Sequence, residues 1–156
     1  MAELTVGAAA PAFELEGPSG PIRLADFAGK SLVVYFYPKD DTSGCTKEAI
    51  DFSQQIEAFT AAGAVILGVS KDSVASHGKF AAKHDLKVLL GSDPSGAMVE
   101  AYGAWVEKSM YGKKYMGIDR STFLLDDKGK IAAVWRKVKV PGHADAVLKA
   151  AQALKG

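Results

Sequence analysis

Residues 32–45 read LVVYFYPKDDTSGC, and this stretch decides the fold that the sequence predicts. Its first six residues are β-branched, aromatic or leucine, which predicts a buried central strand over residues 32–37. A loop rich in proline, glycine and short polar residues then runs to Gly44. Beyond the loop, apolar residues recur at helical spacing, which predicts a helix over residues 45–61. These apolar residues are Ala49, Phe52, Ile56 and Phe59.

Outward from this stretch, the pattern alternates between strands and helices, and Gly63 is a plausible stop for the first helix. Further strands are predicted at residues 64–69, 88–90, 122–125 and 131–135. Further helices are predicted at residues 73–83, 95–102 and 144–154. The last two strands flank a turn at residues 126–129 and form a hairpin. The order predicts an α/β, thioredoxin-like fold, with a mixed central sheet flanked by helices and an N-terminal extension.

The composition of the 156 residues is that of a globular protein, with 48% hydrophobic and 24% charged residues. This length predicts one domain over residues 1–156. A net charge of +1 gives no concentrated basic surface, so nucleic acid is not expected as a partner. The strongest apolar run is far too short to span a bilayer, and no targeting segment is evident. We therefore expect a cytoplasmic protein that does not bind membranes.

Cys45 is the single cysteine, which excludes an internal disulfide and a multi-cysteine metal site within one chain. It stands where a loop enters a helix. Unpaired backbone N–H groups and the positive end of the helix dipole favour the reactive thiolate there. A lone cysteine is more often a small buried hydrophobic residue. Position alone leaves both interpretations open.

The residues around Cys45 also allow two interpretations each. The Thr42 hydroxyl can cap the helix or bind the thiolate or a bound oxygen. Pro38 fixes the backbone between strand and loop, and Gly44 lets the backbone approach a polar ligand. Glu48 is expected in the first helical turn, pointing away from the sulfur, where it complements the dipole or orients an arginine.

Arg120 and Tyr37 are the other candidates for the site. Arg120 directly precedes the strand-like run STFLLD, and at the end of a sheet near Cys45 its guanidinium would stabilise a thiolate. The plainer alternative is a surface ion pair with Asp119. Tyr37 stands beside Pro38, from where it can reach the active site.

The spacing P-x-x-x-T-x-x-C, formed by Pro38, Thr42 and Cys45, resembles the peroxiredoxin active-site motif. The wider context VVYFYPKDDTSGCTKEA resembles the peroxiredoxin Q subfamily, also called bacterioferritin comigratory protein. Four later stretches resemble the same subfamily in the same order, so the resemblance extends over nearly the whole chain from Gly7. They read GVSKDSVASHGKFAAKH, SDPSGAMVEAYGAW, MYGKKYMGIDRSTFLLD and GKIAAVWRKVKVPGHAD.

The resemblance implies thiol-dependent reduction of hydrogen peroxide and organic hydroperoxides, without metal, haem or flavin. Cys45 corresponds to the peroxidatic cysteine, which becomes a sulfenic acid. Thr42 and Arg120 correspond to the residues that hold the thiolate and the peroxide. Pro38 corresponds to the proline that shields the pocket, and the backbone N–H groups of Gly44 and Cys45 would complete the peroxide cradle.

The sequence departs from the subfamily at two positions. Ile50 stands where many members carry a resolving cysteine, and Ser43 stands where proline is usual. The sulfenic acid must then be reduced by an external thiol, such as thioredoxin, glutaredoxin, glutathione or a similar thiol. The resemblance further implies a monomer or a weak dimer. The alternative function is that of a peroxide sensor or redox-dependent binding module without sustained turnover.

Overall fold

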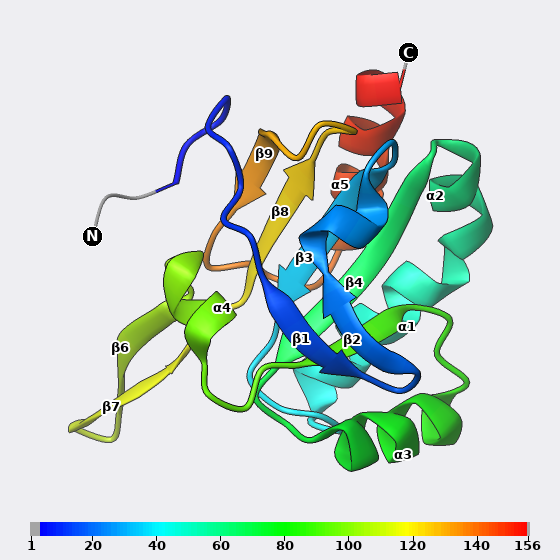
Figure 1. The fold of residues 1–156 in the computed structure, drawn as a ribbon. Coiled ribbons are helices and arrows are strands. Elements are labelled where there is room, and N and C mark those ends of the chain that lie inside the picture. The colour runs from blue at the N-terminus through cyan, green and yellow to red at the C-terminus, as the bar shows by residue number, and fades with distance from the viewer. Residues whose placement is uncertain (1–3, 156) are drawn as a thin grey trace.

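In the computed structural model, which describes residues 4–155, the strand β3 (Ser31–Phe36) lies at the heart of a seven-stranded sheet. The strand order is β2-β1-β5-β4-β3-β8-β9 (Figure 1). The neighbours of β3 are β4 (Ala64–Ser70), which is parallel, and β8 (Ser121–Leu125), which is antiparallel. β5 (Leu89–Ser92) pairs with β4 in parallel, and β9 (Ile131–Trp135) pairs with β8 in an antiparallel hairpin. The predicted mixed sheet is confirmed.

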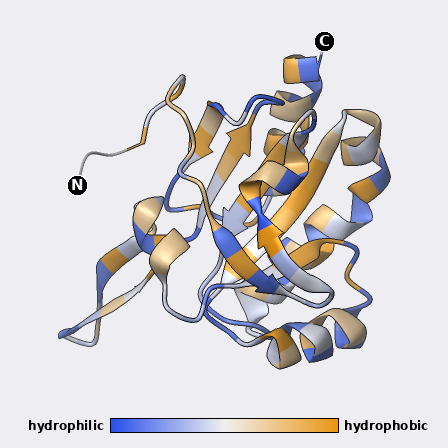
Figure 2. Ribbon diagram, viewed as in Figure 1, coloured by the Kyte–Doolittle hydropathy of each residue, from blue (hydrophilic) through white to orange (hydrophobic). Residues whose placement is uncertain are grey.

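The side chains of β3 alternate between two hydrophobic cores because successive residues of a strand point to opposite faces. Val33 and Tyr35 join the core that also holds Phe52, Phe59 and other residues of the flanking helices. Residues 32, 34 and 36 join the opposite core with residues of the N-terminal segment and of the helix α4 (Ala97–Ala101). Both faces of the strand therefore pack in apolar cores. The neighbouring strand β4 is largely coloured as hydrophobic in Figure 2.

The helix predicted over residues 45–61 is two helices, α1 (Ser43–Gln54) and α2 (Ile56–Ala61). α1 begins two residues earlier than predicted because Thr42 is extended and its carbonyl accepts the first helical hydrogen bond, from the N–H of Thr46. The break falls at Gln55, whose backbone (φ −108°, ψ 15°) closes the last turn of α1. Phe52 and Phe59 remain buried in one core on either side of the break.

The remaining predicted helices are present with small shifts at their ends. α3 (Val74–His84) has Ser73 as its N-cap, with the side chain accepting a hydrogen bond from the backbone N–H of Ser76. α5 (His143–Lys155) closes the chain over the same sheet face as α1, while α4 is shorter than predicted. None of the helices within residues 4–155 is long and apolar enough to cross a membrane.

Two hairpins and a short helix were not predicted. The N-terminal extension forms β1 (Glu14–Gly17), β2 (Gly20–Arg23) and a 3₁₀ turn (Leu24–Phe27), and β1 adds to the sheet beside β5. β6 (Trp105–Met110) and β7 (Lys113–Ile118) form a separate hairpin that projects from the body (Figure 1). These strands are short or largely exposed, so they lack the apolar pattern that predicts a strand. The ends of the predicted domain, residues 1–3 and 156, lie outside the described residues.

Ser43 occupies the first position of α1, and the extended backbone of Thr42 (φ −91°, ψ 157°) is the conformation that a residue before proline adopts. Proline is favoured at this position because its missing N–H has no helical partner there. We expect Ser43→Pro to raise the free energy of unfolding by about 0.4–1 kcal/mol, measured by urea denaturation.

The matched control is Ser53→Pro in the last turns of the same helix. Proline there removes a helical hydrogen bond and is expected to destabilise the protein by about 3 kcal/mol. A destabilising effect of Ser43→Pro would contradict the observed start of α1.

Candidate active site

Cys45 lies in the first turn of α1, directly after the loop that follows β3. It is a free cysteine, and only 1% of its surface is exposed. The first backbone N–H groups of the helix have no helical acceptor, so the sulfur stands at a site that favours negative charge. The predicted position of Cys45 at a helix start is confirmed.

Arg120 reaches Cys45 from the neighbouring strand. The antiparallel register of β3 and β8 pairs Phe36 with Ser121, which places Arg120 at the end of β3 where the active-site loop begins. Its Nη2 donates a hydrogen bond to Cys45 Sγ at 3.2 Å. The Asp119 alternative is wrong: that carboxylate accepts hydrogen bonds from the Ser121 hydroxyl and from a backbone N–H.

Glu48 holds the other side of the guanidinium. Its Oε1 accepts a hydrogen bond from Arg120 Nη1 at 2.7 Å, and the carboxyl is buried. Cys45 and Glu48 are three residues apart and share one face of α1, so a single planar guanidinium can bridge them. The prediction that Glu48 lies in the first turn is wrong because α1 begins at Ser43. The prediction that it orients an arginine is confirmed.

Glu48 and Arg120 differ in how firmly each holds its charge. Burial raises the pKa of Glu48 to about 7, although the Arg120 guanidinium opposes the shift. Burial alone would lower the pKa of Arg120, but Glu48 and Cys45 outweigh it and raise that pKa. Arg120 therefore stays charged, and a protonated Glu48 leaves more of that charge to the sulfur. Glu48 Oε2 has no hydrogen-bond partner among the described residues.

Gly44 makes room for the guanidinium. A Cβ added at Gly44 would lie 3.2 Å from Arg120 Nη2, which is closer than side-chain carbons normally approach. The glycine therefore has a packing role toward Arg120 as well as the predicted backbone N–H near the site. That this N–H donates a hydrogen bond to a peroxide remains a prediction.

Thr42 and Pro38 lie on the exposed side of the loop. The predicted side-chain cap by Thr42 is wrong: its hydroxyl donates to the Lys39 carbonyl at 2.9 Å. Because the hydroxyl hydrogen is engaged, Thr42 Oγ1 can still accept a hydrogen bond from a peroxide O–H. The peroxide-binding role of Thr42 and the shielding role of Pro38 remain predictions.

Tyr37 faces a neighbouring network. Its hydroxyl donates to Asp40 Oδ1 at 2.5 Å and lies 3.3 Å from His77 Nδ1. Its predicted reach to the site is therefore through the loop residue Asp40, and a direct role at Cys45 remains a prediction. The contact between Asp40 and His77 was not predicted. They are 37 residues apart, and no spacing rule connects them.

Possible metal ligands occur in the same network. One ligand atom each of Asp40, Asp72 and His77 lies within 4.8 Å of the others. Asp72 Oδ2 accepts hydrogen bonds from the Asp40 N–H and from the Ser70 hydroxyl. Asp40 Oδ2 is likewise engaged by His77. A cation would have to displace these bonds, so internal hydrogen bonding accounts for the cluster.

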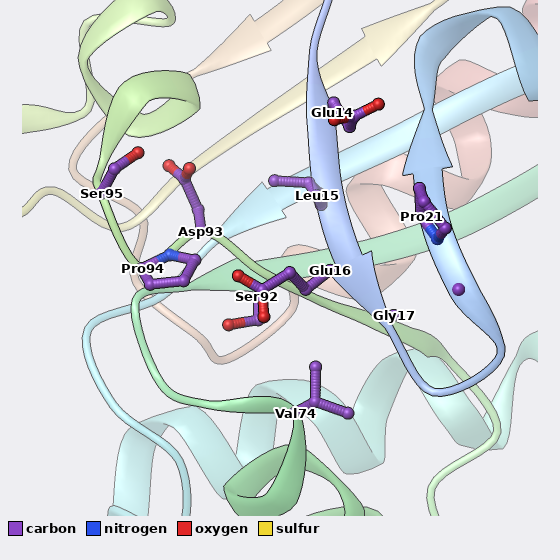
Figure 3. A pocket seen from close by; sticks show the side chains of 11 residues that line it. Glu14, Leu15, Glu16, Gly17, Pro21, Val74, Ser92, Asp93, Pro94 and Ser95 are labelled. Carbon is purple, nitrogen blue, oxygen red and sulfur yellow. The ribbon is translucent and has the colours of Figure 1, made fainter.

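A pocket of about 570 Å³ lies apart from Cys45, between the β1–β2 hairpin and the segment after β5 (Figure 3). Glu14, Glu16 and Asp93 give it an acidic lining. Two of these carboxylates have internal partners, since Glu14 binds Arg23 and Asp93 accepts the Val99 N–H. None of the residues that line this pocket belongs to the site around Cys45.

Comparison with known proteins gives consistent matches over most of the chain. The model of the AhpC/TSA family matches residues 6–134. Peroxiredoxin Bcp of Bacillus subtilis is 49% identical over 153 residues, covering 97% of this chain and 96% of the relative. Peroxiredoxin Bcp of Xanthomonas campestris is 55% identical over 126 residues, covering 81% of this chain and 79% of the relative.

Solved structures agree with this match. A structure of Xanthomonas campestris peroxiredoxin Q superposes with a TM-score of 0.89 at 49% identity, covering 98% of both chains. A cysteine-to-serine mutant of Xylella fastidiosa PrxQ superposes with a TM-score of 0.91 at 37% identity, again covering 98% of both chains.

The raised pKa of Glu48 predicts a pH dependence of stability. The folded protein binds more protons than the unfolded chain between the ordinary carboxyl pKa of 4.5 and about 7. The Glu48 contribution to stability is therefore present below 4.5 and is lost as the pH rises toward 7. We expect wild type to lose on the order of 2–3 kcal/mol relative to Glu48→Gln across this window.

Urea denaturation at a series of pH values measures this difference. Glu57→Gln, which replaces an exposed glutamate of α2, is the control and should follow wild type throughout. Parallel curves for wild type and Glu48→Gln would show that burial does not shift the Glu48 titration.

The close approach at Gly44 predicts a second effect. In Gly44→Ala the guanidinium must move away from the sulfur, which weakens a charged hydrogen bond by about 1 kcal/mol. We expect alkylation of Cys45 by iodoacetamide to slow by roughly 5-fold, equivalent to that loss. Gly78→Ala in α3 is the matched control, because its Cβ would meet no atom within 4 Å. An unchanged rate in Gly44→Ala would mean that Arg120 tolerates the Cβ.

Proposed function

The chain belongs to the AhpC/TSA family and is a peroxiredoxin, and from this premise we propose that Cys45 carries out its peroxidase reaction. The protein is an enzyme, a thiol-dependent peroxidase. The observation that carries the assignment is the 3.2 Å hydrogen bond from Arg120 Nη2 to Cys45 Sγ at the start of α1. The substrates are hydrogen peroxide and organic hydroperoxides. Alkyl peroxide reduction activity is ascribed to the bacterioferritin comigratory protein of Xanthomonas campestris, a relative of solved structure.

In the first half-reaction, the Cys45 thiolate attacks the terminal peroxide oxygen. A sulfur–oxygen bond forms as the O–O bond breaks, and sulfur gives two electrons to the peroxide. The leaving oxygen takes a proton and departs as water or an alcohol, while Cys45 becomes a sulfenic acid. Arg120 and the N–H groups of the first turn of α1 stabilise the thiolate and the negative charge that develops on the oxygens.

The other residues of the site hold the peroxide. Thr42 Oγ1 accepts a hydrogen bond from the peroxide, because its own hydrogen is bound to the Lys39 carbonyl. The backbone N–H groups of Gly44 and Cys45 donate to the peroxide oxygens. Pro38 shields the entrance at the start of the loop. Glu48 fixes the plane of Arg120 so that one edge of the guanidinium faces the sulfur.

The second half-reaction needs an external thiol, because the chain has one cysteine. A first thiol condenses with the sulfenic acid, releasing water and forming a mixed disulfide. A second thiol then displaces Cys45 as a thiolate and leaves as the oxidised disulfide. Thioredoxin, glutaredoxin with glutathione, or a similar thiol supplies these electrons. Ile50, where a resolving cysteine stands in many relatives, is half-buried on α1.

The cellular setting follows from the same chemistry. A reduced lone thiol suits a reducing compartment, so we place the protein in the cytoplasm. It acts there as one domain over residues 1–156 and as a monomer or weak dimer. Neither nucleic acid nor a membrane is a partner.

The test is stopped-flow tryptophan fluorescence with one equivalent of hydrogen peroxide. Trp135 is a suitable reporter because it packs edge-on against His143, and His143 is close enough to the site for the charge of Arg120 to affect it. Burial and that charge lower the pKa of His143 to about 4. We expect a fast second-order phase that Cys45→Ser abolishes. Arg120→Lys should slow it by roughly 100-fold, because lysine cannot bridge Sγ and Glu48.

Arg136→Lys is the matched control. Arg136 donates to the backbone carbonyls of Tyr102 and Gly103, so its replacement should leave the fast phase within a factor of about three. A wild-type rate equal to that of a free thiol would refute the assignment of Cys45. A fast first phase without turnover in the presence of glutathione or thioredoxin would favour the sensor alternative.

A further inference from the structure

The loop before Cys45 is fastened to the body of the protein through one buried carboxylate, that of Asp40. Asp40 Oδ1 accepts a hydrogen bond from the Tyr37 hydroxyl at 2.5 Å. Its Oδ2 lies 2.7 Å from the Ser76 hydroxyl and 2.7 Å from His77 Nδ1. Its backbone N–H donates to Asp72 Oδ2 at 2.8 Å. Three of these partners come from α3 or the turn before it, so α3 holds the loop in place.

His77 is committed on both sides of its ring. Nδ1 faces the Asp40 carboxylate at 2.7 Å, and Nε2 faces the Gly91 carbonyl at 3.1 Å. A carbonyl oxygen and a carboxylate oxygen are hydrogen-bond acceptors, so both sides of the ring are engaged by the protein. The contact between His77 and Asp40 is buried, since only 4% of either side chain is exposed.

The charge state of Asp40 follows from its hydrogen bonds. Burial would raise the pKa of its carboxyl, but hydrogen bonds from His77, Tyr37 and Ser76 outweigh burial and hold that pKa below its ordinary value. Removing His77 is costly because the buried Asp40 carboxylate then loses a hydrogen-bond partner. The pair therefore fixes the loop more firmly than an exposed ion pair does.

Asp41, the next residue, has a strained backbone, so the loop needs contacts that hold it in this conformation. Asp41 has a φ of +60°, a conformation that costs a non-glycine residue free energy. Its carboxylate binds Lys83 and His84 at the far end of α3, but this pair is exposed and contributes little. Thr42 follows at once and starts α1 through its carbonyl. Thr42 is two residues from Asp40, so a displacement of Asp40 also displaces Thr42 and the start of α1.

We propose that His77 is a positioning residue of the peroxidase reaction, which acts through Asp40 to hold Thr42 and the first turn of α1 in reactive geometry. This proposal rests on the function proposed above for Cys45. His77 touches neither the sulfur nor the peroxide. It acts because misplacing a reacting group by about 1 Å can slow a reaction roughly 100-fold.

Two neutral substitutions separate the two sides of the ring. In His77→Asn the amide nitrogen takes the place of Nδ1 and keeps the bond to Asp40. In His77→Gln the amide nitrogen takes the place of Nε2 and keeps the bond to the Gly91 carbonyl. Both replace the ring by a neutral amide, so they differ in the link to the loop.

We expect the second-order rate with hydrogen peroxide to fall roughly 30-fold or more in His77→Gln and no more than about 5-fold in His77→Asn. Asp40→Asn should match His77→Gln, and the double variant Asp40→Asn, His77→Gln should lose little more, because both remove one link. His84→Asn is the matched control on the same helix and should stay within about 2-fold, because its pair with Asp41 is exposed.

Hydrogen exchange of the backbone N–H groups of residues 40–46 gives a readout that is independent of activity. His77→Gln should exchange faster there than His77→Asn, while the urea midpoints of both variants show how far each is destabilised as a whole. Equal peroxide rates for the two variants, or equal exchange, would overturn the positioning role. A wild-type rate no faster than that of Cys45→Ser would instead refute the proposed function, so the two failures are distinguishable.

Discussion

The guanidinium of Arg120 lies between two buried acidic groups, with Nη2 on Cys45 Sγ and Nη1 on Glu48 Oε1. One cation thus serves two potential anions, and its division between them depends on the protonation of Glu48. The raised pKa of Glu48 makes the carboxyl the weaker competitor near neutral pH. In the proposed reaction, more of the Arg120 charge is then available to the sulfur that attacks the peroxide.

The fold places the Arg120 guanidinium at the start of α1. Arg120 is 75 residues from Cys45 in the chain, and the antiparallel pairing of β3 with β8 brings the two together. Gly44 leaves the space into which the guanidinium fits. On the opposite side of the loop, Asp40 is bound to α3. The segment from Asp40 to Cys45 is therefore fixed from two sides, by the sheet and by α3.

The burial of Cys45 separates the two halves of the proposed reaction. A peroxide is small and can meet the sulfur where it lies, whereas a thiol on a protein must approach an atom of a residue that is 1% exposed. The chain has one cysteine, so it has no second thiol of its own that could react with Cys45. In the proposed reaction, a protein thiol therefore needs closer access to the first turn of α1 than a peroxide does.

The sequence by itself determined the central strand, most of the helices and strands in their order, and the place of Cys45 at the start of a helix. These depend on local patterns: a run of β-branched and aromatic residues, apolar residues at helical spacing, and a cysteine where a loop meets a helix. The same patterns missed the break at Gln55, the β6–β7 hairpin and the N-terminal strands, where turns and exposed residues carry little periodicity. They also misplaced the start of α1, and with it the turn that holds Glu48.

Only the tertiary structure decided how the site is assembled. Arg120 bridges Cys45 and Glu48 and does not pair with Asp119. The Thr42 hydroxyl donates to the Lys39 carbonyl and does not cap the helix. The tertiary structure also joined Asp40 to His77, a contact that was not predicted from the sequence. The physical reason is that hydrogen bonds and ion pairs depend on distances of about 3 Å between groups far apart in the chain. Strand register and helix packing set those distances, and neither can be read from the spacing of residues along the chain.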